Sequence, residues 1–189
     1  ATSNWYGFNY PDAAASFATD STEHFLGVKS LKITQTAAMS GSHAYCQHLS
    51  IVGGQTYTLS GYMKTSNVAT NGSAGAGASL FIDFHNEEKY LSSATMTGTT
   101  GTTDWHRIKI TFIAPPTANA INAYCGLRNA TGTVWFDCLQ LETGNTMNDY
   151  NMLSESNFAT RYFWGGDNLG VSDGVNLDKQ KGTLVGQAN

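Results

Sequence analysis

The chain has 189 residues, of which 13% are charged and 12% aromatic, and its formal net charge at pH 7 is −4. Nucleic-acid binding requires clustered Lys and Arg, whereas the 10 basic residues here are dispersed along the chain. No apolar run approaches the roughly 20 residues that a membrane-spanning helix needs, so the sequence predicts neither a nucleic-acid partner nor a membrane span.

The first 26 residues are rich in aromatic side chains and contain the first strand, whose bounds the sequence does not define. From residue 28 onward apolar and polar side chains alternate. Leu31 and Ile33, each flanked by polar neighbours, indicate a half-buried strand. Residues 45–51 predict another strand, which ends before a Gly-Gly turn.

The clearest strand covers residues 57–64. Its two faces are separated by the period of two that a strand imposes. One face carries Tyr57, Leu59, Gly61 and Met63, and the other carries Thr58, Ser60, Tyr62 and Lys64. We expect the first row to pack in the core and the second row to point outward.

Three later segments show the same period, at residues 78–85, 106–112 and 123–128. Their expected inward rows are Leu80, Ile82 and Phe84; His106, Ile108, Ile110 and Phe112; and Ala123, Cys125 and Leu127. Small and polar residues at 71–77 and 92–103 predict loops. Many short strands between turns, with almost no helical period, predict two antiparallel sheets packed face to face.

A long apolar stretch from Gly132 to Glu142 begins at a turn and continues with β-branched, aromatic and aliphatic residues. This composition predicts a strand that is buried on much of both faces. A polar segment without periodicity then leads to Tyr150. The domain is therefore expected to end there.

This closing stretch, with its Leu-Glu-x-Gly ending, resembles the last strand of carbohydrate-binding-module-like (CBM4/9/22-like) β-sandwiches of bacterial cell-surface, wall-associated and YD-repeat (RHS-type) proteins. Residues 27–33, 53–65 and 102–112 resemble the early strand, the central hairpin strand and the long later strand of that family. The resemblance covers about residues 1–150 and implies an all-β, antiparallel β-sandwich of jelly-roll type.

Residues 151–189 are expected to form a linker and the start of a second module, because the run from Asn151 to Phe158 resembles the opening of another copy. The apolar residues that follow are too sparse for an independent core. The alternative is a segment that packs back on the first domain. Either way, the resemblance implies a larger multimodular chain.

The outward rows predict a sugar-binding face. Sugars are recognised by flat aromatic rings that stack on a pyranose and by planar polar groups that bond its hydroxyls. The predicted ligand-binding residues are Tyr62, Lys64, Phe81, Asp83, His85, Tyr124 and Arg128, all expected on neighbouring strands of one sheet. In the families that the chain resembles, a glycan chain lies on this concave sheet.

The resemblance implies a non-catalytic module of an extracellular or cell-surface bacterial protein that binds a polysaccharide or cell-wall glycan. One alternative is a structural spacer, in which the outward aromatic residues are ordinary cross-strand pairs. Another is a jelly-roll polysaccharide lyase, which would use Tyr62, His85 and Arg128 for proton abstraction. The five His residues show no ligand spacing, and no catalytic motif is present.

Members of the resembled family commonly hold a structural calcium ion between the early and closing strands, and Ca²⁺ requires oxygen ligands. The resemblance places Asp137, Glu23 and the carbonyl near Gly27 at this site. Cys138 stands where a second acidic residue is often found, so one oxygen ligand is missing. The alternative is an Asp137 carboxylate that is satisfied by backbone amides.

Three cysteines, Cys46, Cys125 and Cys138, lie inside predicted strands. Small buried thiols are the expected state. A disulfide between Cys125 and Cys138 is the alternative, and it requires that the two late strands be adjacent.

Overall fold

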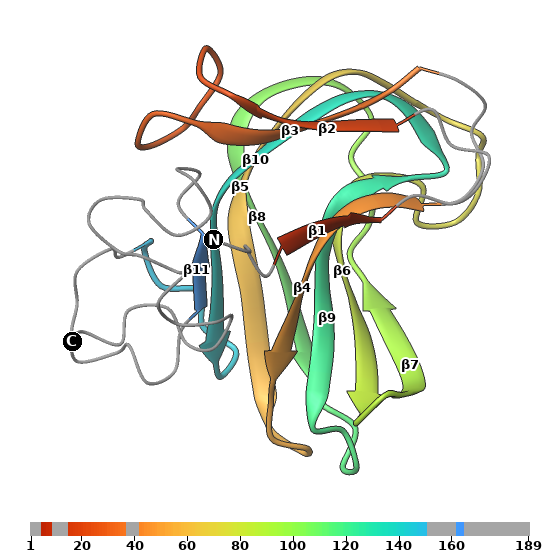
Figure 1. Cartoon of the computed structure of the whole chain (residues 1–189), viewed down its shortest axis with the longest axis vertical. Helices are drawn as coiled ribbons and strands as arrows, with labels where there is room; N and C mark the ends of the chain where they lie inside the picture. Colours follow the sequence, from red (N-terminus) through yellow and green to blue (C-terminus); the bar gives the residue numbers. More distant parts are fainter. Residues whose placement is uncertain (1–4, 9–14, 37–41, 151–161, 165–189) are drawn as a thin grey trace.

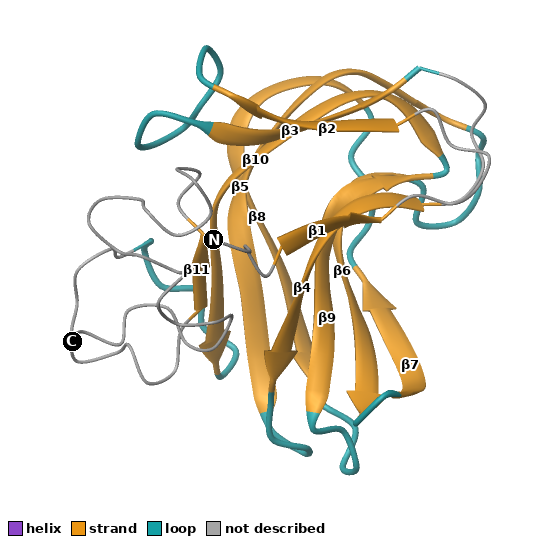
Figure 2. Cartoon of the chain, viewed as in Figure 1, coloured by secondary structure: helices purple, strands orange, loops and turns teal. Residues whose placement is uncertain are grey.

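The computed structural model describes residues 5–8, 15–36, 42–150 and 162–164. Within these ranges the chain forms eleven strands and no helix (Figure 2). The pairings between these strands are antiparallel. The prediction of an all-β, antiparallel fold is confirmed.

The strands form two sheets that face each other (Figure 1). Sheet A has the order β1 (Trp5–Phe8), β4 (Ser42–Ser50), β9 (Ala120–Arg128), β6 (Gly77–Asn86) and β7 (Lys89–Thr95). Sheet B has the order β2 (Ala15–Asp20), β3 (Ser30–Gln35), β10 (Ala130–Thr143), β5 (Thr56–Thr70) and β8 (Gly101–Ile113). A short strand, β11 (Tyr162–Trp164), pairs with β10.

Most connections carry the chain from one sheet to the other. From β3 to β6 each strand lies in the sheet opposite its predecessor, and the same holds from β7 to β10. Such crossing between sheets is the connectivity of a jelly roll, and it closes the sandwich without long unpaired strands.

The core fills the space between the sheets. Leu80, Ile82 and Phe84 reach it from β6, and Leu59 and Met63 reach it from β5. All five are at most 4% exposed. The period of two therefore predicted correctly which side chains of these strands point inward.

Strand β7 corrects one expectation, because residues 92–95 belong to it although the sequence predicted a loop over 92–103. A tight turn at Glu87, where φ is +52°, folds β7 back against β6. Strand β7 is an edge strand that is rich in Ser and Thr, so it lacks the apolar rhythm by which buried strands are recognised.

Strand β10 exchanges one neighbour for another along its length. Strand β3 pairs with it only as far as Phe136, and β11 pairs with Leu139–Leu141 on the same strand. Between these two segments lies a bulge, where Cys138 adopts a φ of +52°. Near the start of β10, Gly132 has a φ of +118°, and a Cβ atom there would lie 2.7 Å from the Asn67 carbonyl oxygen, so only glycine fits.

The cysteine alternative is wrong. Cys125 and Cys138 are buried thiols that are not joined to each other, and they lie on β9 in sheet A and β10 in sheet B. The side chain of Cys46 lies outside what the structure describes.

Little of the tail can be compared with its prediction, because residues 151–161 and 165–189 lie outside the described part of the chain. The boundary at Tyr150 therefore stays a prediction. Backbone pairing of β11 with β10 favours the alternative in which this segment returns to the first domain. In the described part of the chain, no helix is long and apolar enough to cross a membrane.

Candidate functional site

Two rows of side chains run side by side on the outer face of sheet A. Strand β6 contributes Phe81, Asp83 and His85, and β9 contributes Asn122, Tyr124 and Arg128. Phe81 is the register partner of Tyr124, and Asp83 is that of Asn122, so the outward positions of both strands coincide. The structure thus brings together five of the seven predicted ligand-binding residues: Phe81, Asp83, His85, Tyr124 and Arg128.

The two aromatic rings in these rows stack on each other. The ring centroids of Phe81 and Tyr124 are 4.6 Å apart and their planes differ by 6°. Both residues are nearly buried, at 8% and 9% exposure. The guanidinium of Arg128 lies over the Phe81 ring at 5.3 Å and donates a hydrogen bond to the Thr95 hydroxyl at 2.6 Å. The two rings therefore pack against each other and stabilise this part of the sheet, and they offer little open surface for a sugar to stack on.

Asn122 links three strands on this face. Its Oδ1 lies 2.8 Å from His48 Nδ1 on β4, and its Nδ2 lies 3.3 Å from His85 Nε2 on β6. The same amide nitrogen donates to the Tyr124 hydroxyl at 3.4 Å. One side-chain amide thereby fixes the orientation of two imidazoles, which present donors and acceptors at the surface.

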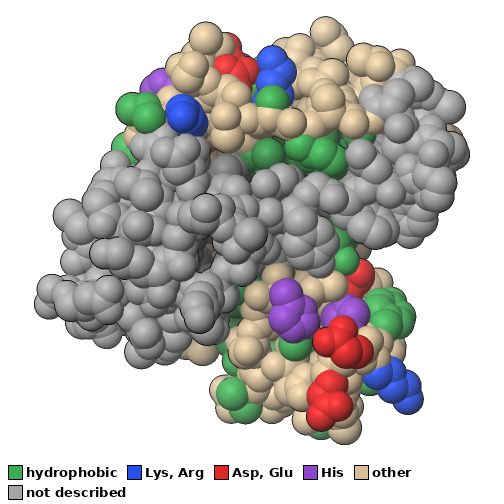
Figure 3. All heavy atoms as spheres, in the orientation of Figure 1, with side chains coloured by type: hydrophobic (Ala, Val, Ile, Leu, Met, Phe, Trp, Pro, Cys, Tyr) green, Lys and Arg blue, Asp and Glu red, His purple; other side chains and the backbone are tan. Residues whose placement is uncertain are grey.

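An exposed aromatic ring borders this polar cluster. Tyr90 on β7 is the register partner of His85, and its ring centroid lies 6.0 Å from the imidazole in an edge-on arrangement. Tyr90 is 53% exposed. We call His48, His85, Tyr90 and Asn122 the polar corner. In Figure 3, imidazoles, acidic groups and an exposed hydrophobic side chain gather on the lobe where β6, β7 and β9 lie.

Asp83 lies between the stacked rings and the polar corner. Burial raises the pKa of its carboxyl group above the ordinary value, while a hydrogen bond with Tyr124 and the charges of His85 and Arg128 oppose this shift. A half-buried carboxylate in such a position accepts hydrogen bonds from hydroxyl donors when it is ionised.

Three residues of the polar corner, His48, Tyr90 and Asn122, were missed by sequence reasoning. Asn122 could have been found, because it precedes Tyr124 by two positions and so shares its face. His48 and Tyr90 carry no such signal. Their place depends on the order of strands in sheet A, which periodicity does not reveal.

Tyr62 and Lys64 lie elsewhere, so the expectation of seven residues on neighbouring strands of one sheet is wrong. Both belong to β5 in sheet B. The Tyr62 ring stacks on Phe25 at 3.6 Å, and Lys64 Nζ pairs with Glu23 at 2.8 Å. The alternation of side chains shows which face of its own strand a residue occupies, but it does not show which sheet the strand belongs to. Strands β5 and β6 lie in different sheets, so their outward faces point to opposite sides of the sandwich.

The surroundings of Asp137 do not fit the expected calcium site. Its Oδ2 accepts hydrogen bonds from the amides of Phe25 and Leu26 at 2.9 and 3.0 Å, and its Oδ1 accepts one from the Cys138 amide at 2.7 Å. Amide hydrogens repel a cation, and the Glu23 carboxylate already pairs with Lys64. No group of three or more His, Cys, Asp or Glu in the described ranges is arranged to hold a metal. The calcium ion stays a prediction.

Comparison with known proteins identifies the family. A family profile described as a carbohydrate binding domain matches residues 1–131. The chain belongs to this carbohydrate-binding domain family. The match includes all five strands of sheet A and the polar corner, but it ends at the start of β10.

Solved structures agree on the fold. The carbohydrate-binding domain is similar to the CBM22-1 xylan-binding domain of Paenibacillus barcinonensis Xyn10C, with a TM-score of 0.52 and 13% identity over 76% of this chain and 88% of that one. It is also similar to the C-terminal family 22 carbohydrate-binding module of Clostridium thermocellum Xyn10B, with a TM-score of 0.52 and 14% identity over 79% and 91% of the two chains. These likenesses establish a jelly-roll β-sandwich.

Curated relatives are much longer proteins. The chain is 28% identical over 186 residues to the tRNA(Glu)-specific nuclease WapA of Bacillus subtilis subsp. natto and to the tRNA nuclease WapA of Bacillus subtilis strain 168. Each match includes 88% of this chain. The chain spans only 7% of the length of these relatives, so their nuclease activity does not transfer to it.

Proposed function

We propose that this chain is a non-catalytic carbohydrate-binding module of an extracellular bacterial protein, and that it binds a polysaccharide on the outer face of sheet A. The observation that carries the proposal is the polar corner, where one amide orients two imidazoles beside an exposed Tyr90 ring. A pyranose presents an apolar ring face and a rim of hydroxyls. The corner offers a matching aromatic surface and fixed hydrogen-bonding groups.

The site residues divide by role in this proposal. Tyr90 stacks on a sugar ring, and His48, His85 and Asp83 bond its hydroxyls. Asn122 positions both imidazoles. Phe81, Tyr124 and Arg128 form the packed surface of sheet A beside the polar corner. We expect a dissociation constant in the millimolar to micromolar range, about −4 to −8 kcal/mol, because water competes for every hydroxyl and association is itself costly.

The lyase alternative loses its geometric basis. Proton abstraction would require Tyr62, His85 and Arg128 in one site, but Tyr62 lies on β5 in sheet B while the other two lie in sheet A. The spacer alternative differs only in that the face binds nothing, so a binding measurement decides between spacer and binder.

The likeness to much longer Bacillus proteins supports a place in a longer, multimodular chain. In such a chain, a carbohydrate-binding module would hold the whole protein against a wall glycan. The net charge of −4 supports a glycan rather than a nucleic acid as the partner of this segment.

The test is affinity electrophoresis in gels that contain xylan, β-glucan, mannan or purified cell-wall polymer. We expect retardation of the natural chain in at least one gel, and its loss in Tyr90→Ala and Asn122→Ala variants whose melting is unchanged or only slightly lowered. A matched control is Val52→Ala, which removes an apolar side chain of 62% exposure outside the polar corner. If no polysaccharide gel retards the natural chain relative to a gel without polysaccharide, the result would favour the spacer.

A further inference from the structure

A second group of aromatic rings lies on the outer face of sheet B. Phe25, in the loop between β2 and β3, lies nearly parallel to the Tyr62 ring, with 12° between the planes. The Trp105 ring is tilted by 57° to Phe25, and their centroids are 6.2 Å apart. Phe25 nevertheless remains 42% exposed. The stack with Tyr62 therefore leaves part of the Phe25 side chain open to solvent.

The backbone on either side of this ring is fixed. The amides of Phe25 and Leu26 both donate to the buried Asp137 carboxylate, which lies at 0% exposure on β10. Two residues earlier, Glu23 pairs with Lys64 on β5. An exposed ring that is already ordered loses little conformational freedom when a ligand stacks on it.

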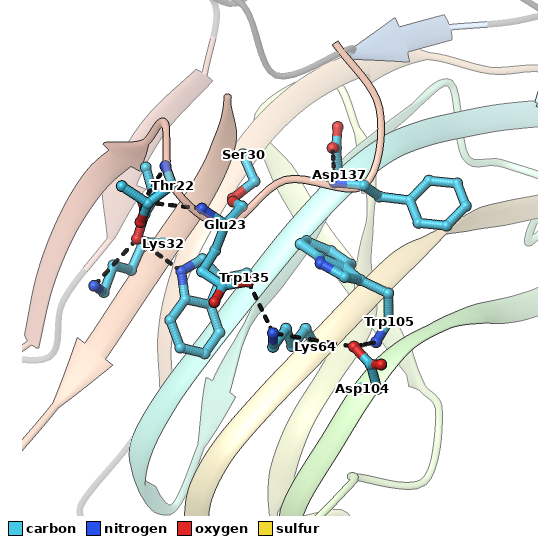
Figure 4. A network of polar contacts seen from close by, with 11 residues as sticks. Thr22, Glu23, Ser30, Lys32, Lys64, Asp104, Trp105, Trp135 and Asp137 are labelled. Atoms are coloured by element: carbon cyan, nitrogen blue, oxygen red, sulfur yellow. Dashed lines mark hydrogen bonds and ion pairs between the residues drawn. The ribbon is translucent and has the colours of Figure 1, made fainter. Parts of the chain in front are cut away.

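Charged groups of both signs lie beside the Trp105 ring (Figure 4). Lys64 Nζ lies 2.8 Å from Glu23 Oε2 and 4.0 Å from Asp104 Oδ1. The hydrogen bond that Lys64 donates to the Glu23 carboxylate raises the pKa of the Lys64 ammonium above its ordinary value, so the ammonium stays charged at neutral pH. The rim thus carries hydrogen-bond donors and acceptors with a small excess of negative charge, which disfavours an anionic ligand and suits a neutral one that both donates and accepts hydrogen bonds.

We propose that Phe25 and Trp105 form a second glycan-binding site that takes a single neutral pyranose ring, with Glu23, Lys64 and Asp104 bonding its hydroxyls. The site goes beyond the proposed function, because it lies on the opposite sheet from the polar corner. A module with both sites holds two glycan chains at once, one on each face of the sandwich.

The size of the patch favours a sugar over a protein partner. A standard protein interface buries roughly 800 Å² on each side. The exposed parts of Phe25, Leu26 and Val28, with the Trp105 ring, offer at most a few hundred Å², because a whole aromatic side chain covers only about 150–250 Å². One sugar ring against one aromatic ring fits this extent.

The test uses NMR titration of the whole chain with xylohexaose, cellohexaose and laminarihexaose. The Trp105 indole N–H signal, assigned with a Trp105→Phe variant, reports on sheet B, and backbone amides of β6 and β9 report on sheet A. We expect the indole signal to move with at least one sugar. In Phe25→Leu, which keeps apolar contact with Tyr62 but lacks a flat ring, the apparent affinity should fall about 3- to 10-fold. Ile113→Ala, at an exposed residue of the same sheet, is the matched control.

The two sites are separable in this experiment. Tyr90→Ala should leave the Trp105 titration unchanged and abolish the shifts on sheet A. An immobile indole signal with every sugar, or an equal response in Phe25→Leu and the natural chain, would overturn the second site while leaving the site on sheet A intact. A response at Trp105 without one on sheet A would support the second site and contradict the proposed function.

Discussion

The indole nitrogen of Trp135 donates a hydrogen bond to an Asp20 carboxylate oxygen at 3.0 Å. Asp20 also accepts from the amide and hydroxyl of Thr22 and from Lys32 Nζ. Trp135 lies on β10 and Asp20 ends β2, so this hydrogen bond joins the edge strand of sheet B to its central strand. Trp135 is only 8% exposed, which fits a structural role for this side chain.

Protonation of the Asp20 carboxylate at low pH should weaken this contact. The hydrogen bonds, above all that from Trp135, hold the pKa of Asp20 far below its ordinary value. A depressed pKa stabilises the fold above the unfolded value of about 4, and this stabilisation is lost as pH falls through the folded value. We expect Asp20→Asn to lower the unfolding free energy at pH 7 by about 1–3 kcal/mol. Urea unfolding at pH 7 and pH 3 should show a smaller difference between the two proteins at pH 3. An equal difference at both pH values would contradict this role.

Asp137 should produce the opposite pH dependence. Burial raises its pKa to about 6, although the amides of Leu26, Phe25 and Cys138 oppose the shift. A raised carboxyl pKa contributes stability that is complete below the unfolded value of about 4 and is lost as pH rises through 6. We expect the natural chain to gain up to about 3 kcal/mol from this group between pH 7 and pH 4. Asp137→Asn, compared by urea unfolding over the same range, should lack this gain. Parallel pH profiles of the two proteins would show that Asp137 does not titrate there.

Removal of calcium is a separate test of the same residue. Because amides fill the hydrogen-bonding positions of the carboxylate, we expect excess EDTA to leave the melting temperature unchanged. An ion that binds only the folded state stabilises it by mass action. A clear fall in melting temperature on chelation, reversed by added Ca²⁺, would contradict this expectation and support the calcium site that the sequence predicts.

Truncation after Tyr150 tests the domain boundary. It removes β11 and opens the edge of β10 at Leu139–Leu141. The few backbone hydrogen bonds of this pairing are each worth about 0.5–1.5 kcal/mol, so we expect the unfolding free energy to fall by roughly 1–3 kcal/mol. Thermal and urea unfolding measure the loss. An unchanged midpoint would support the original expectation that residues 151–189 begin a second module.

The faces of single strands could be predicted from the sequence, but their assembly could not. Alternation correctly placed Leu80 and Met63 in the core and Phe81 outside it. It could not tell that β5 and β6 lie in different sheets, so Tyr62 was joined to a site on the other side of the molecule. Strand order depends on contacts between distant segments, and those contacts leave no local pattern.

The candidate site shows the same limit. Asp83 and His85 were found because aromatic and polar residues alternate on their own strand. Tyr90 was missed because its edge strand has no apolar period, and it becomes a site residue only through its register with His85. Phe81 and Tyr124 looked like open stacking platforms, but outward-facing rings on neighbouring strands bury one another when they stack.

Chemical-shift mapping with bound sugar tests the central claim most directly. The whole chain would be titrated with a soluble oligosaccharide of the polysaccharide that retards it in affinity gels, and backbone amides would be followed by ¹H–¹⁵N correlation spectra. We predict saturable shifts at residues 83–90 and at 122–124, together with movement of the Asn122 side-chain amide. Saturable binding that leaves the amides and side chains of these residues unmoved would contradict a glycan site on sheet A.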